Sequence, residues 1–218
     1  MWEKYVLFID GEAIVIDKPA GLAVHPGSAT PESLENYLRH FRFGFQREPL
    51  PVHRLDRDTS GCLLLARNPK AHKLFQRAFE EKRVAKIYVA ILDGVPQAEA
   101  GTVDMPLGKV STREEGWRIV HDPKGKEAVT HWRTAAVKDE RAVVVFTPET
   151  GRTHQIRVHA ASGIGIPISG DPVYGGGRGP MLLHALSLRL ERPGKNPVEA
   201  TAPLPPTFVN AGFGDVEL

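Results

Sequence analysis

The chain has 218 residues and a formal net charge of +2 at pH 7, from 28 lysines and arginines against 26 aspartates and glutamates. Its hydrophobic fraction of 41% and charged fraction of 25% are those of a globular chain, and they exclude disordered and fibrous proteins. The apolar runs are too short to cross a bilayer and the first residues lack a signal-peptide pattern, so we expect a cytoplasmic protein. The length predicts a single domain over residues 1–218.

The chain is predicted to begin with a β-hairpin. The segments "YVLFI" and "EAIVI" are strand-like, and Asp10-Gly11 between them is a dipeptide that accepts the positive φ angles of a two-residue turn. After a loop rich in proline and glycine, Thr30 and Pro31 are the expected N-cap and first residue of an amphipathic helix over residues 30–41.

Strands outnumber helices in the rest of the chain, and several neighbouring strands are joined by short turns. This pattern predicts an α+β fold with a mixed, mainly antiparallel β-sheet core flanked by helices and loops. The single cysteine, Cys62, lies in a predicted strand, where a free thiol is a small core residue. The expected elements are strands at 61–68, 85–94 and 181–190, a strand pair over 127–149 that turns at 138–141, and helices at 69–79 and 153–163.

Three polar clusters adjoin this regular structure. In the first, "HRLDRDTSG", Asp56 precedes a buried strand, where a carboxylate can be partly desolvated and still be kept ionised by a neighbouring cation. Asp56 could equally be an ordinary turn aspartate. That interpretation suits Asp58 better than Asp56, because the turn continues after Asp58. The sequence therefore indicates Asp56 as a candidate for chemistry.

The other two clusters are "AKIYVA" and "GRTHQIRVH". Tyr88 lies in the first of them, although most strand tyrosines only pack. Arg157 lies one turn inside the predicted helix, where a carboxylate from another segment can meet it. The backbone N–H groups of "GRTHQ" and the side chain of Arg152 suit a phosphate group, but an ordinary capped helix is the commoner meaning of such a segment.

Several common kinds of site are excluded. His154 and His159 are poorly spaced for two metal ligands on one helix, and no cysteine or carboxylate joins them, so we predict no metal site. The sequence has no dinucleotide fingerprint, Walker motif or serine nucleophile elbow. We therefore expect chemistry or binding without a cofactor.

Cations and aromatic rings alternate over residues 39–47, where Arg39, Arg42 and Arg47 are interleaved with phenylalanines. This alternation suits a nucleic-acid surface. A solvated face whose rings point inward explains it equally well.

Taken together, the three clusters resemble, in order and spacing, the motifs of the RluA-type family of RNA pseudouridine synthases. "HRLDRDTSG" resembles the catalytic motif of that family, "AKIYVA" its K-x-Y motif, and "GRTHQIRVH" its G-R-T-H-Q-I-R-x-H segment. The flanking segments "IVIDKPAGLAVHPG", "GDPVYGG" and "LLHA" extend the resemblance from Ile14 to Leu190. Many members carry an N-terminal RNA-binding domain of the S4 type, for which this chain leaves no room, so we expect a stand-alone catalytic domain.

The resemblance implies a role for each matching residue. Asp56 would be the catalytic aspartate, and Arg157 would form an ion pair with it. Tyr88 would stack on the flipped target base and serve in removing the proton from C5. Arg54 would enter the RNA stack and hold the target nucleotide out. The set of substrate-binding residues is completed by His53, Arg152 and Leu183, of which the last would line the base pocket.

The implied reaction converts specific uridines of structured ribosomal or transfer RNA to pseudouridine. It breaks the N1–C1′ bond, turns the uracil and joins C5 to C1′, so it needs no cofactor or metal. Asp56 would either attack C1′ as a nucleophile or remove a proton from C2′ to give a glycal, and the sequence leaves both routes open. Either route needs the target base to leave the RNA stack.

Two other functions compete with this interpretation. A non-catalytic RNA-binding or RNA-chaperone protein of the same fold would have no need for an aspartate in an RNA-facing pocket, where it repels phosphate. A glycosidase-like hydrolase would need a second carboxylate, which the other two clusters lack. We further predict that residues 39–47 and the loops at 104–127 contact the RNA, and that the protein is a monomer.

Overall fold

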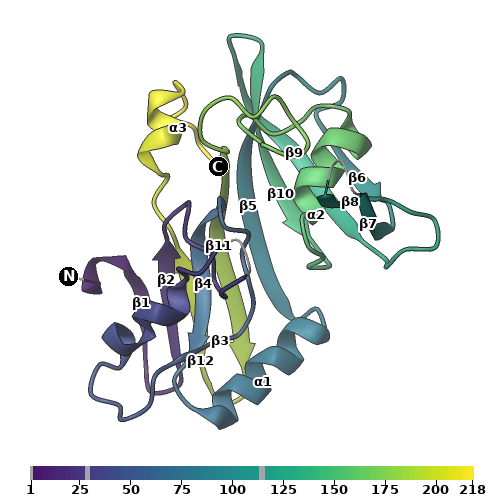
Figure 1. Cartoon of the computed structure of the whole chain (residues 1–218). Helices are drawn as coiled ribbons and strands as arrows, with labels where there is room; N and C mark the ends of the chain where they lie inside the picture. Colours follow the sequence, from purple (N-terminus) through teal and green to yellow (C-terminus); the bar gives the residue numbers. More distant parts are fainter. Residues whose placement is uncertain (1, 28–29, 113–115) are drawn as a thin grey trace. The chain divides into compact units, whose positions relative to one another are not determined.

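The computed structural model of the chain describes residues 2–27, 30–112 and 116–218. The chain divides into two compact units, and Figure 1 shows that each is built mainly from strands. The predicted α+β class with mainly antiparallel strands is confirmed. The single domain predicted for the whole chain stays a prediction, because compactness within a chain does not measure independent folding. Unit 1 is Met1–Lys86 with Ala185–Pro203, and unit 2 is Ile87–His184 with Leu204–Leu218.

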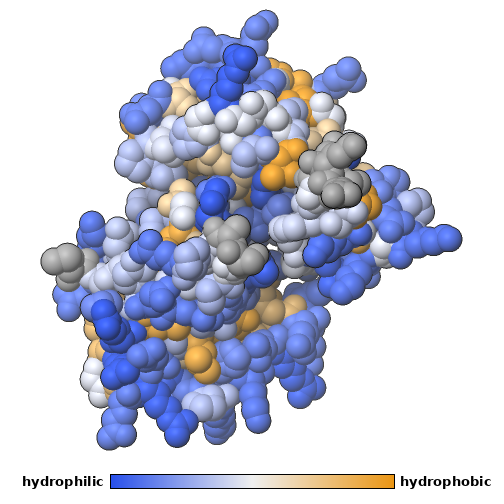
Figure 2. All heavy atoms as spheres, in the orientation of Figure 1, coloured by the Kyte–Doolittle hydropathy of each residue, from blue (hydrophilic) through white to orange (hydrophobic). Residues whose placement is uncertain are grey.

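Two long strands contribute residues to both units. They are β5 (Val84–Leu92) and β11 (Leu183–Arg192), and each was predicted from its apolar run. None of the helices in the described part of the chain has the length and hydropathy needed to span a bilayer. Figure 2 shows hydrophilic side chains over most of the visible face of each unit.

Unit 1 has the strand order β1-β2-β4-β11, with β12 on β11 and β3 on β4. Every residue of β4 is buried, and Cys62 within it is a core residue whose thiol pKa is raised to about 12 by burial. Figure 1 shows α1 along one face of these strands, and Phe75 is buried there. The remaining elements are η1 (Glu3–Tyr5), β1 (Val6–Ile9), β2 (Ala13–Lys18), η2 (Leu34–Phe41), β3 (Leu50–Pro51), β4 (Ser60–Ala66), α1 (Pro69–Glu80) and β12 (Lys195–Thr201).

Local side-chain contacts decide where the elements of unit 1 begin. The predicted first hairpin is confirmed, but neither Asp10 nor Gly11 has a positive φ, so the two-residue turn was wrong. Instead, the Asp10 carboxylate accepts the backbone N–H groups of Glu12 and Ala13, each at 2.8 Å, and closes a longer turn.

Two helices of unit 1 show how a cap sets a boundary. The helix predicted from Thr30 begins only at Leu34, because the side chain of Asn36 accepts the N–H of Ser33 at 2.8 Å and caps the helix there. Helix α1 begins at Pro69 as predicted, and the side chain of Asn68 accepts the N–H of Ala71 at 2.9 Å.

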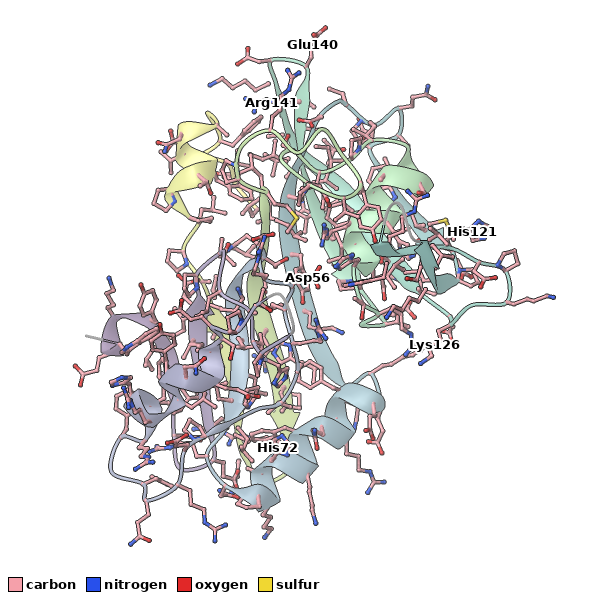
Figure 3. The ribbon with its side chains drawn as sticks, viewed as in Figure 1. Asp56, His72, His121, Lys126, Glu140 and Arg141 are labelled. Carbon is pink, nitrogen blue, oxygen red and sulfur yellow. The ribbon has the colours of Figure 1, made fainter. Side chains whose placement is uncertain are left out.

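Unit 2 has the strand order β5-β10-β9-β6, with β7 and β8 paired as a separate hairpin. The predicted strand pair turning at 138–141 is confirmed, and Figure 3 shows Glu140 and Arg141 at its tip. Asp139 and Glu140 have φ values of 51° and 58°, which are the left-handed conformations of a tight hairpin turn. The elements are β6 (Ala100–Asp104), β7 (Leu107–Thr112), β8 (Gly116–His121), β9 (Val129–Lys138), β10 (Arg141–Pro148), α2 (Gln155–Val158), η3 (His159–Ile164) and α3 (Pro206–Asn210).

The helix predicted at 153–163 is shorter and differently capped. Helix α2 holds only four residues and continues as the π-helical turn η3. Its N-cap is His154 in the left-handed conformation, with φ 54°, and not the predicted Thr153. The side chain of Gln155 accepts the N–H of Arg152 at 2.9 Å, so the chain turns one residue later than expected.

Candidate active site

Asp56 lies in the loop that precedes β4, and Figure 3 labels it there. It is partly exposed, and its backbone carbonyl accepts the N–H of Thr59 at 3.1 Å to close a turn. The turn leads into Gly61, whose φ of +105° strongly favours glycine. A Cβ at Gly61 would lie 2.2 Å from the carbonyl oxygen of Ala185, so this close approach also requires glycine. The sequence "DRDTSG" is therefore a turn whose far end is fixed by packing.

The side chain of Lys18 is hydrogen-bonded to the backbone of this turn. The side chain is fully buried, and its ammonium donates hydrogen bonds to the carbonyl oxygens of Pro19 at 2.7 Å, Leu22 at 2.8 Å and Arg57 at 3.1 Å. The carbonyl of Arg57 also accepts the N–H of Gly21 at 2.9 Å. Two loops that are distant in the sequence are thus joined at one carbonyl oxygen next to Asp56.

Sequence analysis did not select Lys18. The only signal was a lysine at the end of the apolar run "AIVID", directly before a proline. Burial lowers the pKa of Lys18 to about 7, while the negative charges of Asp58, Asp56 and Asp17 act in the opposite direction. The ammonium therefore adds positive potential beside the Asp56 turn, and its charge titrates near neutral pH.

His53, in the same loop as Asp56, has a structural role. His53 accepts the N–H of Leu64 at its Nε2 atom, 3.0 Å away, and its ring stacks on Phe79 at 4.5 Å. Burial and the charge of Lys86 lower the pKa of His53 to about 3, so its imidazole is neutral and fastens the loop to β4. Its predicted contact with substrate stays a prediction.

The remaining charged residues of this loop point to different roles. Arg54 is exposed, as a group that enters RNA must be. Asp58 is bound by the guanidinium of Arg57, with nitrogen–oxygen distances of 3.1 and 3.2 Å. This pairing agrees with the prediction that Asp58 is a turn residue.

In unit 2, Arg157 is buried and forms a two-point ion pair with Asp171. Its Nε and Nη2 atoms lie 2.7 and 2.8 Å from the two carboxylate oxygens. Oδ1 of Asp171 also accepts the N–H groups of Val173 and Tyr174. Burial alone raises the pKa of Asp171, but Arg157 and these N–H groups outweigh it and hold the pKa below its usual value.

The resemblance implied a different carboxylate, Asp56, as the partner of Arg157, and that ion pair stays a prediction. Asp171 was missed by sequence analysis, although the flanking match "GDPVYGG" contains it. The structure shows that Arg157 has a carboxylate partner within its own unit, which fixes the guanidinium plane whatever else it binds.

Three further predicted residues are placed in unit 2. Tyr88 lies in β5 opposite Phe146 of β10 and is partly exposed, and its ring packs on the core of the unit. Leu183 is buried at the start of β11. Arg152 is exposed and donates from Nε to the carbonyl of Glu127 at 3.0 Å. The phosphate site proposed at the helix start loses one donor, because the N–H of Arg152 is bonded to Gln155.

In the basic aromatic segment at 39–47 some side chains are buried and others exposed, and its binding of RNA stays a prediction. Phe41 is buried and points inward, whereas Arg42 and Phe45 are exposed. Arg67 fixes the backbone of this segment, since its Nη2 atom donates to the carbonyls of Arg42 at 3.0 Å and Phe43 at 2.9 Å. Its guanidinium also lies 3.8 Å from the centre of the Phe45 ring. The loops predicted at 104–127 are mainly the β7–β8 hairpin, of which residues 113–115 lie outside the described residues, and their contact with RNA stays a prediction.

The mainly antiparallel α+β fold is that of the pseudouridine synthases. The sequence profile of the RNA pseudouridylate synthase family matches residues 12–162, and the chain belongs to this family. It is an RNA pseudouridine synthase, an isomerase.

Individual relatives agree with this assignment. An uncharacterized RNA pseudouridine synthase of Zymomonas mobilis is 56% identical over 214 residues, which cover 96% of this chain and 98% of that protein. Ribosomal large subunit pseudouridine synthase D of the same organism is 39% identical over 196 residues, which cover 86% of this chain and 61% of that protein. The structure of human RNA pseudouridylate synthase domain containing 4 covers all of this chain and 95% of its own, with a TM-score of 0.83 and 26% identity.

Proposed function

We propose that the protein isomerises specific uridines of structured ribosomal or transfer RNA, with Asp56 as the catalytic residue and with the target base flipped out of the stack. The observation that carries the proposal is the accessible Asp56 carboxylate on a turn held by the buried Lys18. The similarity to an enzyme named for the large ribosomal subunit makes large-subunit ribosomal RNA the first substrate to test.

The Asp56 turn suits both chemical routes. A carboxylate that attacks C1′ or removes the C2′ proton must be ionised and must meet the ribose in one orientation. The hydrogen bonds from Lys18 and Gly21 to the carbonyl of Arg57 limit the motion of the turn, so little reorganisation is needed when the ribose arrives.

The other residues have proposed roles that follow from the family motifs. Arg54 is exposed on the same loop as Asp56, where a long cation can replace the extruded nucleotide in the RNA stack. In unit 2, Tyr88 and Leu183 would contact the flipped base, and Tyr88 would take part in removing the C5 proton. Arg157 would orient the Asp56 carboxylate, and Arg152 would bind a phosphate of the RNA.

The test is to map pseudouridine in total RNA from cells with the wild-type protein, with Asp56→Asn and without the protein. We expect a defined set of uridines in large-subunit ribosomal RNA to lose modification in the last two strains. Asp58→Asn is the matched control, because its carboxylate is bound by Arg57 and it should leave the set modified.

Each departure from this pattern has a separate meaning. If modification persists with Asp56→Asn, Asp56 is not the catalytic residue. If the dependent uridines lie in transfer RNA alone, the ribosomal substrate is wrong while the catalytic assignment holds. If no uridine depends on the protein, the proposed reaction is wrong for this chain.

A further inference from the structure

The β7–β8 hairpin carries a tryptophan on its packing face. Leu107 and Ile119 are buried on that face and form a small core with Ala128 and Val158. Trp117 lies two residues before Ile119 in β8, so its side chain leaves the same face of the strand. Yet 48% of Trp117 is exposed. The packing face of the hairpin therefore continues, toward its tip, into an aromatic surface that the described residues only half cover.

Two cationic or polar side chains adjoin this indole. The ammonium of Lys109 lies 5.2 Å from the centre of the Trp117 ring. Lys109 is on the opposite strand, two residues before Ser111, which pairs with Trp117, so the two side chains share one face of the hairpin. On the other side the ring of His154 lies 5.2 Å from the Trp117 ring, tilted by 32°. The surface formed by Trp117, Lys109 and His154 is called the hairpin platform below.

The left-handed backbone at His154 points to a functional role for its imidazole ring. With φ 54° it has a conformation that glycine adopts freely and that side chains with a Cβ rarely adopt. The imidazole is held there by Tyr174, whose hydroxyl lies 2.9 Å from Nδ1 of His154 and accepts the N–H of Ile119 at 3.0 Å. Tyr174 thus joins the hairpin to the platform histidine.

The same tyrosine connects the platform to the predicted catalytic residues of unit 2. The guanidinium of Arg157 lies 5.2 Å from the centre of the Tyr174 ring, and Asp171, the partner of Arg157, accepts the N–H of Tyr174 at 3.0 Å. One short chain of contacts therefore runs from Arg157 through Tyr174 to His154 and Trp117.

We propose that the hairpin platform stacks an unpaired base of the RNA, at a position other than the isomerised uridine, and that Tyr174 fixes the platform relative to Arg157. This rests on the proposed function only in that the ligand is RNA. A half-exposed indole next to a cation is the surface on which single-stranded nucleic acids stack, and such stacking tolerates every base.

The charges of the hairpin favour RNA over a protein partner. From residue 107 to 126 the sequence has five cationic side chains against three acidic ones, Glu114, Glu115 and Asp122. Figure 3 labels Lys126, one of these cations, just after the hairpin, together with His121 at the end of β8. A surface of this sign attracts phosphate groups while the aromatic ring takes the base. The five cationic residues are Lys109, Arg113, Arg118, Lys124 and Lys126.

The test compares binding of two labelled single-stranded oligoribonucleotides of about 10 nucleotides, one of uridines and one of abasic ribose phosphates. Fluorescence anisotropy with the whole protein measures both dissociation constants. Wild type should prefer the uridine oligomer, and Trp117→Ala should weaken its binding by about tenfold while leaving the abasic oligomer unchanged. Trp117→Phe keeps a ring and should keep most of the preference.

Controls separate stacking from other causes. Val137→Ala, at a side chain that is 55% exposed on β9, removes apolar surface elsewhere in unit 2 and should change neither constant. If Trp117→Ala retains the preference for the uridine oligomer, or weakens both oligomers equally, the platform does not stack a base and the proposal is wrong. Because this assay needs no turnover, a wild-type protein that forms no pseudouridine would contradict the proposed function separately.

His154→Gly distinguishes a positioning role from a merely structural one. Glycine adopts the left-handed backbone freely, which offsets part of the lost contact with Tyr174, so the variant should stay folded. It should nonetheless bind the uridine oligomer more weakly, since the ring that supports Trp117 is lost. Equal or tighter binding by His154→Gly would exclude His154 from the platform.

Discussion

Two buried cations, Lys18 in unit 1 and Arg157 in unit 2, are held by opposite means. In the described part of the chain, the hydrogen-bond acceptors of the Lys18 ammonium are three backbone carbonyl oxygens, at 2.7 to 3.1 Å. Arg157 has a carboxylate, Asp171, bound through two nitrogen atoms. The compact ammonium can be surrounded by carbonyl dipoles from several directions, whereas the planar guanidinium matches the two oxygens of a carboxylate.

The kind of hydrogen-bond acceptor determines how much of each cation's positive potential remains in its surroundings. Carbonyl dipoles stabilise the charge of Lys18 without cancelling it, so positive potential remains beside Asp56, and burial lowers the lysine pKa to about 7. The Arg157–Asp171 pair is neutral as a whole and forms a rigid connection within unit 2. The comparison indicates that Lys18 acts by charge and Arg157 by position.

The largest effect is expected from separating the buried pair. Asp171→Asn keeps an oxygen for the N–H groups of Val173 and Tyr174 but removes the negative charge that binds two nitrogen atoms of the buried Arg157. The free energy of unfolding should fall by about 3–5 kcal/mol in urea denaturation. Acid should act similarly on wild type, because a carboxyl whose pKa is lowered on folding loses its contribution as the pH falls below about 4.

A double variant controls for the charge. Arg157→Met with Asp171→Asn removes both charges and should recover part of the lost stability. The exposed pair of Arg77 and Glu81 on α1 is the matched control, and Glu81→Gln should leave stability nearly unchanged. A double variant as unstable as the single one would show that the charge is not what the pair contributes.

An intermediate effect is expected at Lys18. Lys18→Met leaves the carbonyls of Pro19 and Leu22 without this donor and should lower the free energy of unfolding by about 2 kcal/mol at pH 7. It should also slow pseudouridine formation, since the Asp56 turn loses both its anchor and the nearby positive charge. Lys70→Met, at an exposed lysine of α1, is the control for losing a positive charge.

The pH dependence distinguishes this lysine from Arg157. Between pH 7 and 10 the unfolded chain binds a proton at Lys18 that the folded protein has released, so the contribution of this group to stability rises with pH in that window. The rise should be smaller in Lys18→Met. An equal rise in both proteins would mean that Lys18 is not the group that titrates.

The smallest effect is expected at Arg67, a guanidinium that is bonded to carbonyls as Lys18 is. Its partners are the carbonyls of Asp10, Arg42 and Phe43, and burial lowers its pKa. Arg67→Lys cannot reach all three and should cost about 1 kcal/mol. Hydrogen exchange should accelerate at residues 42–45 but not at β4. Acceleration throughout unit 1 would show that Arg67 supports more than this segment.

The sequence by itself determined the features that depend on near neighbours. Hydrophobic spacing after Asn68 and Pro69 was enough to predict α1, and alternation around 138–141 was enough for the β9–β10 pair. The order of three motifs was enough to identify the family, and it made Asp56 the candidate catalytic residue. Each of these signals is carried by residues within a few positions of one another, so it does not depend on how the chain packs.

Only the tertiary structure decided which distant groups meet. The segment "DKPAG" does not show that Lys18 is buried, because water is excluded from it by the loop that contains Arg57. Nor does "GRTHQIRVH" show that Arg157 meets Asp171, or that a left-handed His154 meets Trp117. Burial, ion pairing and ring contacts depend on chain segments far apart in the sequence, and packing alone brings those segments together.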